Sequence, residues 1–223
     1  MKLGSLAYKL IIQACVVIGR LLYGLKVEGM ENIPSSGACI IVLDHPGAMS
    51  RAFQVHLILA RRKLETWGAF SPEIGFGSLN RIRPKRLIEG AREERRFLYD
   101  YRLPGRSTAE LWKALELLHR GKAIVLAPEG EATWDGRLQP LKPGAAWLAL
   151  RAHVPVVPMV TIGAYDILPR WTLWPRLRGK LTVRVGKPFY VSEGPCPRVT
   201  HEMVQEASQR IWKELAALLA KGA

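Results

Sequence analysis

Short apolar runs alternate along the chain with stretches in which apolar residues recur at helical spacing. The runs at residues 40–43 and 123–126 are bounded by polar or turn residues, a pattern typical of strands buried on both faces of a sheet. The segments that we predict as strands are residues 26–28, 40–43, 66–70, 123–126, 155–162 and 181–185. The segments that we predict as helices are residues 50–63, 107–120, 144–151 and 200–218. This alternation predicts an α/β fold with a central mixed, largely parallel sheet flanked by helices.

The first 25 residues are strongly apolar but carry a polar stripe. Lys2, Lys9, Gln13 and Arg20 fall on one narrow face of a helix. A secretory signal would need a convincing cleavage site, and a spanning helix would have to bury two cations. We therefore expect residues 1–25 to form an amphipathic helix or helical pair in a membrane interface, ahead of a single α/β domain at residues 26–223. An ordinary amphipathic helix packed on the domain is the alternative.

The charge balance indicates an anionic partner. The sequence has 33 Lys and Arg against 19 Asp and Glu, a formal net charge of +14. Nucleic acid, an anionic membrane surface, a phosphorylated substrate and an acidic carrier protein all fit this charge. A hydrophobic content of 48% excludes intrinsic disorder as the main state. The three cysteines are far apart, so they indicate neither a disulfide framework nor a metal site, and a reducing cytoplasm is the natural setting.

Polar groups follow three of the predicted strands. They are Asp44 and His45, then Glu129 and Gly130, then the loop after residues 160–163. Open α/β sheets bind ligands at this edge, and a histidine there can act as a general base near neutral pH. The basic segment 81–86 suits recognition of a phosphate. A structural histidine and a solvated basic face are the simpler alternatives.

Four blocks of the sequence stand out by their residues and their order. They read His45-Pro46-Gly47-Ala48-Met49-Ser50, then Arg81 or Arg83 (with Arg106 a weaker candidate), then Ala127-Pro128-Glu129-Gly130-Glu131 followed by residues 141–146, then residues 154–158. In this order they resemble the blocks of the glycerolipid acyltransferases that make phosphatidic acid, the 1-acylglycerol-3-phosphate acyltransferase-like proteins. The resemblance covers roughly residues 38–165, and Pro-Glu-Gly, Lys-Pro-Gly-Ala-Ala and Val-Pro-Val-Val-Pro at this spacing are its most specific part.

The resemblance implies transfer of a fatty acyl group from a thioester, either acyl-CoA or acyl carrier protein, to the hydroxyl of a lysophospholipid such as lysophosphatidic acid. His45 would be the general base, by the logic of a serine-protease triad. Pro128, Glu129 and Gly130 would shape the acceptor site, and Arg81 or Arg83 would hold the phosphate. No metal or bound cofactor is expected, and the enzyme would lie at the cytoplasmic face of a membrane.

Position 50 departs from the family, which has Asp where this chain has Ser50. A serine hydroxyl can orient an imidazole but supplies no charge to stabilise imidazolium. Asp44 could substitute for the missing carboxylate, the serine could be a deliberate change, or the chain could be a weak or inactive relative that binds lipid. Ser50 would also make a good N-cap for the following helix. Ala127 in place of an aromatic residue and Glu131 in place of Thr leave the acceptor open.

Aromatic and basic residues interleave in residues 169–178, where Trp171 and Trp174 lie among three arginines. This composition suits a membrane interface and also suits stacking on single-stranded nucleic acid. The apolar N-terminal segment favours the membrane. A nucleic-acid-binding protein remains the third interpretation, after the acyltransferase and the inactive lipid-binding relative.

Overall fold

The computed structural model of the chain describes residues 13–14, 16–47, 50–62, 66–68, 107–172 and 174–221. The predicted phosphate ligands Arg81 and Arg83, and the weaker candidate Arg106, lie outside these ranges. So does most of the predicted interface segment 1–25.

A six-stranded sheet forms the centre of the molecule, in the order β1-β6-β5-β2-β4-β3. Its strands are β1 (Lys26–Glu28), β2 (Cys39–Leu43), β3 (Thr66–Gly68), β4 (Ala123–Leu126), β5 (Val156–Ile162) and β6 (Thr182–Val185). All neighbours pair in parallel except β5 and β6, which are antiparallel. The predicted mixed, largely parallel sheet is therefore confirmed.

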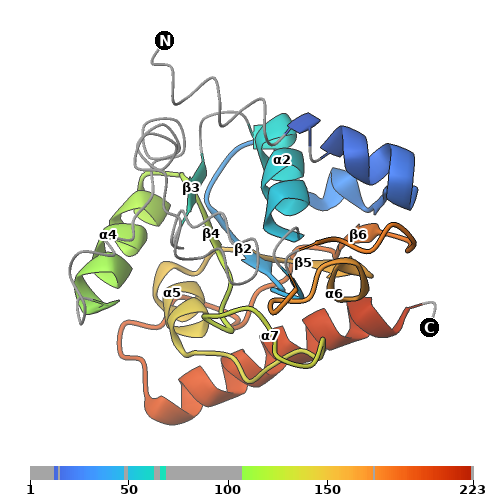
Figure 1. Cartoon of the computed structure of the whole chain (residues 1–223). Coiled ribbons are helices and arrows are strands. Elements are labelled where there is room, and N and C mark those ends of the chain that lie inside the picture. Colours follow the sequence, from blue (N-terminus) through green and yellow to red (C-terminus); the bar gives the residue numbers. More distant parts are fainter. Residues whose placement is uncertain are drawn as a thin grey trace.

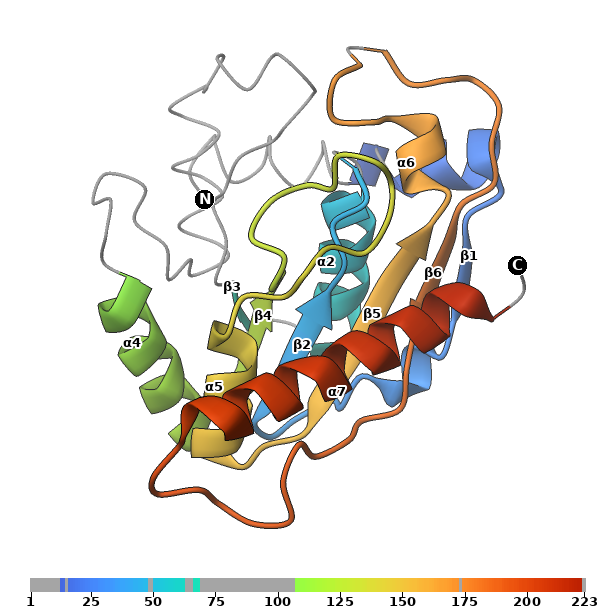
Figure 2. The same cartoon turned by 90° about the horizontal axis from the view of Figure 1, so that it is seen from below.

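Helices cover both faces of this sheet (Figure 1). They are α2 (Ser50–Arg62), α4 (Ser107–His119), α5 (Gly144–Ala152), α6 (Ala164–Ile167) and α7 (His201–Ala220), with a 3-10 turn η1 (Met30–Asn32). One face packs against α4, α5 and α7, and the other packs against the N-terminal helical residues, α2 and α6. The long helix α7 runs across the first face, as Figure 2 shows.

Strand β2 lies in the middle of the sheet, between β4 and β5. All five of its residues are buried. Ile40 and Val42 point into the cluster formed with α4, α5 and α7, whereas Ile41 and Leu43 point into the opposite cluster. A continuous apolar run is what a strand covered on both faces requires. The rigid sheet therefore delivers the residues that follow Leu43 to a fixed position.

Helix α7 follows its predicted pattern. The hydroxyl of Thr200 accepts a hydrogen bond from the backbone N–H of Met203 at 3.3 Å, which caps the helix. The buried residues recur at helical spacing and face the sheet: Ala207, Ile211, Leu215 and Leu218. A strongly periodic segment with a cap is predictable because both signals are local.

Residues 16–23 are helical. One side of this helix packs on the domain, and the other side is apolar and exposed, as a membrane-interface helix would be. Val16 and Tyr23 are buried in the cluster that contains Phe53 of α2, as the packed-helix alternative expects. Its outer side leaves large apolar residues exposed, namely Val17, Ile18, Leu21 and Leu22. Within the described residues, no helix is both long and apolar enough to cross a membrane.

Helix α6 was not predicted. It has four residues and follows directly on β5, after Gly163, whose φ of 84° lies in the left-handed region. A helix of one turn is too short to show a hydrophobic period, so the sequence pattern carries no signal for it. This turn nevertheless brings Tyr165 and Asp166 to the edge of the sheet that holds the candidate site.

Candidate active site

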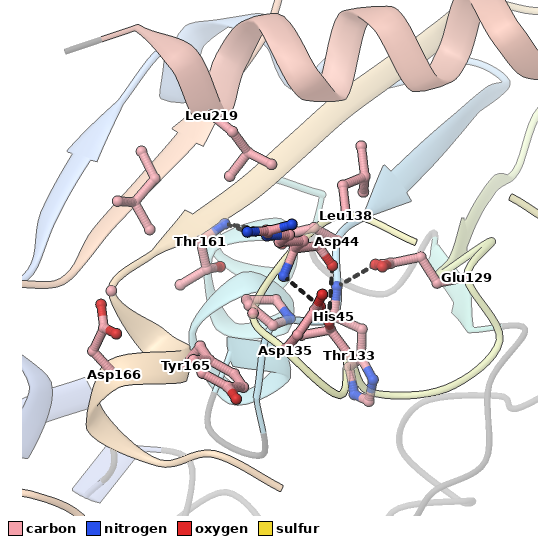
Figure 3. A pocket seen from close by; sticks show the side chains of 15 residues that line it. Asp44, His45, Glu129, Thr133, Asp135, Leu138, Thr161, Tyr165, Asp166 and Leu219 are labelled. Carbon is pink, nitrogen blue, oxygen red and sulfur yellow. Dashed lines mark hydrogen bonds between the residues drawn. The ribbon is translucent and has the colours of Figure 1, made fainter. Parts of the chain in front are cut away.

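The three predicted strand ends meet at one edge of the sheet. Parallel pairing places the carboxyl ends of β2, β4 and β5 together, and a pocket of about 340 Å³ opens there. Asp44 and His45 line it from the end of β2, Glu129 from the end of β4 and Thr161 from β5. In Figure 3, Glu129 approaches His45 on one side of the pocket, and Tyr165 and Asp166 of α6 lie on the other. Both His45 and Glu129 are buried.

Glu129 is bound to the backbone of His45. Its Oε1 accepts a hydrogen bond from the His45 N–H at 2.8 Å, and its Oε2 accepts one from the Gln139 N–H at 2.8 Å. The carbonyl of His45 in turn accepts from the backbone N–H of Thr133 at 2.9 Å. Burial raises the pKa of Glu129, while the hydrogen bonds from Gln139 and His45 lower it. The loop between β4 and α5 thus holds both backbone polar groups of His45.

This loop is itself braced from within. The hydroxyl of Thr133 donates to the Arg137 carbonyl at 2.8 Å and lies 3.1 Å from a carboxylate oxygen of Asp135. The backbone N–H of Arg137 donates to the same carboxylate, and this bond is the main cause that lowers the pKa of Asp135. The side-chain amide of Gln139 donates to Asp135 at 2.9 Å. A braced loop can fix the main chain of a residue on a neighbouring strand.

Pro128 and Gly130 shape the turn that carries Glu129. The carbonyl of Pro128 accepts from the Lys142 N–H at 2.7 Å. Gly130 has a φ of 82°, and a Cβ there would come within 2.3 Å of Lys142 Nζ. Of the three predicted acceptor-site residues, Glu129 is the one that lines the pocket described above. The other two act on the conformation of the loop.

Asp44 joins three elements beneath the pocket. Each of its carboxylate oxygens lies 3.0 Å from the backbone N–H of Thr161 in β5, and Oδ1 accepts from Gln54 Nε2 of α2 at 2.6 Å. Burial raises the pKa of Asp44 well above its ordinary value, against the opposing effect of the Thr161 hydrogen bond. The carboxylate that the sequence offers as a substitute for the missing Asp is therefore engaged with Thr161 and Gln54.

Ser50 is the first residue of α2 and is fully buried. Its hydroxyl donates to the Gly47 carbonyl at 2.8 Å. As an N-cap, the same oxygen would accept a hydrogen bond from a helical N–H, and that role stays a prediction. Gly47 lies so close to α6 that a Cβ would come within 2.7 Å of the Leu168 carbonyl oxygen. Ser50 thus closes the turn that follows His45.

Two buried polar residues at this edge were not singled out from the sequence. Thr161 Oγ1 and Gln54 Oε1 are buried without a hydrogen-bond partner among the described residues. Thr161 lies in a strand end that the sequence did indicate. Gln54 lies one helical turn after Ser50, and this spacing is the signal that could have found it.

A family model described as Acyltransferase matches residues 24–162, the part of the chain that carries the sheet edge and the pocket-lining loops. The chain belongs to the acyltransferase family. The resemblance drawn from the sequence blocks, to the 1-acylglycerol-3-phosphate acyltransferase-like members, is confirmed.

Two curated relatives from plants are named 1-acyl-sn-glycerol-3-phosphate acyltransferases. The chain is 29% identical over 174 residues to the chloroplastic 1-acyl-sn-glycerol-3-phosphate acyltransferase BAT2 of Brassica napus, covering 77% of this chain and 46% of that protein. It is 28% identical over 174 residues to the chloroplastic 1-acyl-sn-glycerol-3-phosphate acyltransferase LPAT1 of Arabidopsis thaliana, covering 77% and 45%. The chain thus spans about half the length of the curated relatives that it matches.

A solved structure shares the fold. The 1-acyl-sn-glycerophosphate (LPA) acyltransferase PlsC from Thermotoga maritima superimposes with a TM-score of 0.63 at 22% sequence identity. The match covers 100% of this chain and 84% of that one. This likeness agrees with the α/β architecture described above.

Proposed function

We propose that the chain is a membrane-associated O-acyltransferase that moves a fatty acyl group from an acyl thioester to the hydroxyl of a lysophospholipid such as lysophosphatidic acid. The observation that carries the proposal is the position of His45, which lines a pocket at the carboxyl end of β2 in a chain of the acyltransferase family. The relatives named 1-acyl-sn-glycerol-3-phosphate acyltransferase support this choice of acceptor.

In this mechanism His45 takes the proton of the acceptor hydroxyl as its oxygen attacks the thioester carbonyl. The carbon–oxygen ester bond forms, the carbon–sulfur bond breaks, and the thiolate leaves with the proton that His45 returns. Backbone N–H groups near the developing oxyanion lower the barrier. The hydrogen bond that the His45 N–H donates to Glu129 and the one that its carbonyl accepts from Thr133 support a fixed position of the His45 main chain during these steps.

Substrate contacts follow the family pattern. Arg81 or Arg83 would hold the acceptor's phosphate, and Glu129 would border the acceptor in a loop whose turn Pro128 and Gly130 shape. The donor would be acyl-CoA or acyl carrier protein, with no metal or bound cofactor. The net charge of +14 supports an anionic acceptor and an anionic membrane surface, which we place at the cytoplasmic face. The predicted interface segment 1–25 would hold the enzyme there.

A catalytically weak or inactive lipid-binding relative is the second candidate, and Ser50 favours it. Its buried hydroxyl donates to the Gly47 carbonyl and brings no negative charge near His45. In a serine protease, loss of the triad charge lowers turnover by about 10⁴-fold. Ser50 would then take the position of the orienting residue with only a hydroxyl to offer.

An acyl-transfer assay separates the two candidates. The purified chain is incubated with lysophosphatidic acid and either acyl-CoA or acyl carrier protein as donor, and phosphatidic acid is measured. Formation of phosphatidic acid in proportion to enzyme is the expected result. Binding of lysophosphatidic acid with no product from either donor, in the natural chain and in Ser50→Asp, would leave the lipid-binding relative.

A further inference from the structure

A half-exposed aromatic surface borders the mouth of the pocket. We call the rim surface the residues Trp134, Arg170, Trp171, Trp174 and Leu177. Their exposed fractions are large for apolar side chains: 55% for Trp134, 50% for Trp171, 83% for Trp174 and 77% for Leu177. Tyr165, which lines the pocket, meets the ring of Trp171 edge-on with centroids 5.9 Å apart. The rim surface therefore continues directly into the pocket wall.

The inner part of the rim surface is rigid although it faces solvent. Trp134 and Trp171 stack with centroids 6.1 Å apart, and the Arg170 guanidinium lies 3.6 Å from the centroid of the Trp134 ring. Arg170 also pairs with Glu131 at 3.1 Å and donates to the Ala132 carbonyl at 2.9 Å. Two tryptophans that are held in place and still half-exposed indicate a surface built for contact.

The N-terminal helix contacts the same segment through Tyr23. The Tyr23 hydroxyl donates to the Arg176 carbonyl at 2.8 Å, and the Leu181 N–H donates to the Tyr23 carbonyl at 3.0 Å. Leu21, two residues before Tyr23, is 78% exposed. Figure 2 shows the N-terminal helix and the segment after α6 at the same end of the molecule. A helix with an exposed apolar side is thus held against the segment that carries Trp174 and Leu177.

The charge of residues 169–180 indicates an anionic partner. Residues 169–180 contain four cations and no acid, and Arg176, Arg178 and Lys180 are exposed. Indoles settle at headgroup depth in a bilayer, and neighbouring cations are attracted to anionic lipids. We propose that the rim surface docks on the headgroup layer of an anionic bilayer and so places the pocket mouth against the membrane. The docking proposal rests on the proposed function only where it assigns a catalytic role to the pocket, because vesicle binding is measured without catalysis.

The consequence concerns how the acceptor reaches His45. With the rim surface in the headgroup layer, a lysophospholipid passes along Tyr165 into the pocket without leaving the membrane for water. The apolar chain then stays in lipid while the headgroup enters the polar site. The membrane contact thereby includes residues well outside the predicted segment 1–25.

Vesicle binding tests the proposal. The full chain is sedimented with vesicles of phosphatidylcholine alone or mixed with phosphatidylglycerol. The double variant Trp174→Ala/Leu177→Ala is expected to bind the mixed vesicles roughly tenfold more weakly, because it loses two apolar side chains that enter the interface. Trp212→Ala is the matched control, since Trp212 is a partly exposed tryptophan on α7, and it should bind like the natural chain.

A second pair of variants tests the charge. Arg176→Glu/Arg178→Glu should abolish the preference for anionic vesicles. Lys187→Glu/Lys213→Glu changes the net charge equally at exposed sites beyond the far end of β6 and on α7, and should keep most of that preference. All four side chains are exposed, so the circular dichroism spectra of both double variants should match that of the natural chain. Equal losses in the two pairs would mean that overall charge, not the cations beside the rim surface, drives binding, and would overturn the proposal.

Catalysis with water-soluble short-chain substrates keeps this proposal distinct from the proposed function. Trp174→Ala/Leu177→Ala should turn over such substrates at the natural rate and should lose turnover of an acceptor carried in vesicles. If the natural chain turns over neither substrate, the proposed function fails while the vesicle result still decides docking. Unchanged vesicle binding by Trp174→Ala/Leu177→Ala would overturn the docking proposal. The docking proposal would also be overturned if Trp174→Ala/Leu177→Ala lost binding to a single-stranded oligonucleotide and still bound vesicles like the natural chain.

Discussion

The carboxylate of Glu129 accepts a hydrogen bond from the backbone N–H of His45, with Oε1 2.8 Å from the nitrogen. These residues lie 84 positions apart and come from the ends of two adjacent parallel strands. The other carboxylate oxygen takes the N–H of Gln139, so both oxygens are used by the chain itself. We infer that Glu129 acts as a positioning residue for His45, in addition to lining the pocket.

Replacing Glu129 tests this role. In Glu129→Gln one amide nitrogen must face a backbone N–H, which leaves a buried donor unsatisfied at a cost of about 1–3 kcal/mol. We expect the free energy of unfolding to fall by that amount and kcat to fall about tenfold or more, with a smaller change in KM. Urea unfolding and steady-state kinetics measure both.

Glu206→Gln is the control, because Glu206 is exposed on α7. It should leave both stability and kinetics unchanged. A Glu129→Gln enzyme with a raised KM for the acceptor and a natural kcat would instead make Glu129 a substrate ligand.

The rate of acyl transfer should depend on the charge of the side chain at position 50. Ser50→Asp introduces a carboxylate at the position where the family has one, so it should stabilise the imidazolium that forms when His45 takes a proton. We expect kcat to rise at least tenfold, with about 10⁴-fold as the upper limit set by a serine-protease triad. Single-turnover kinetics at saturating donor give the rate of the chemical step.

Ser50→Asn has nearly the shape of Asp and no charge, so it separates charge from volume. It should show no such rise. Equal rates in Ser50→Asp and Ser50→Asn would contradict a role for charge at this position.

Asp44 should make stability depend on pH. Burial raises its pKa well above the ordinary value of 3.8, so the folded state binds the proton more tightly than the unfolded chain does. Stability is then greatest below that ordinary value and decreases as pH rises through the folded-state pKa. In Asp44→Asn the amide oxygen still accepts from Thr161 and Gln54, and no ionisation occurs.

Urea unfolding from about pH 4 to about pH 8 measures the effect. The natural chain should lose stability relative to Asp44→Asn across that range as pH rises, and the variant should be at least as stable at neutral pH. Parallel stability curves for the two proteins would show that Asp44 ionises alike in the folded and unfolded states.

The sequence predicted what depends on local pattern. The strand at residues 123–126 and the helices beginning at Ser50 and Ser107 were found because apolar period and bounding residues are read over a few positions. Parallel pairing then brought His45, Glu129 and Thr161 to one edge, as expected for the ends of neighbouring strands.

What the sequence did not reveal depends on tertiary contacts. That Glu129 binds the main chain of His45 follows from how the loop after β4 folds back, and no local spacing encodes it. The close approach of Gly47 to the Ala164 and Leu168 carbonyls involves α6, a helix too short to be seen in the pattern. The sequence thus predicted that His45 and Glu129 lie at one edge of the sheet, whereas it did not predict their hydrogen-bond partners.

Acyl transfer by His45→Ala tests the central claim most directly. A general base contributes about 10²–10⁴-fold to a rate, so kcat with acyl thioester and lysophosphatidic acid should fall by at least that range. His119→Ala, at an exposed histidine in the last turn of α4, should keep the natural rate. A folded His45→Ala protein that transfers acyl groups as fast as the natural chain would contradict the assignment of His45 as the base.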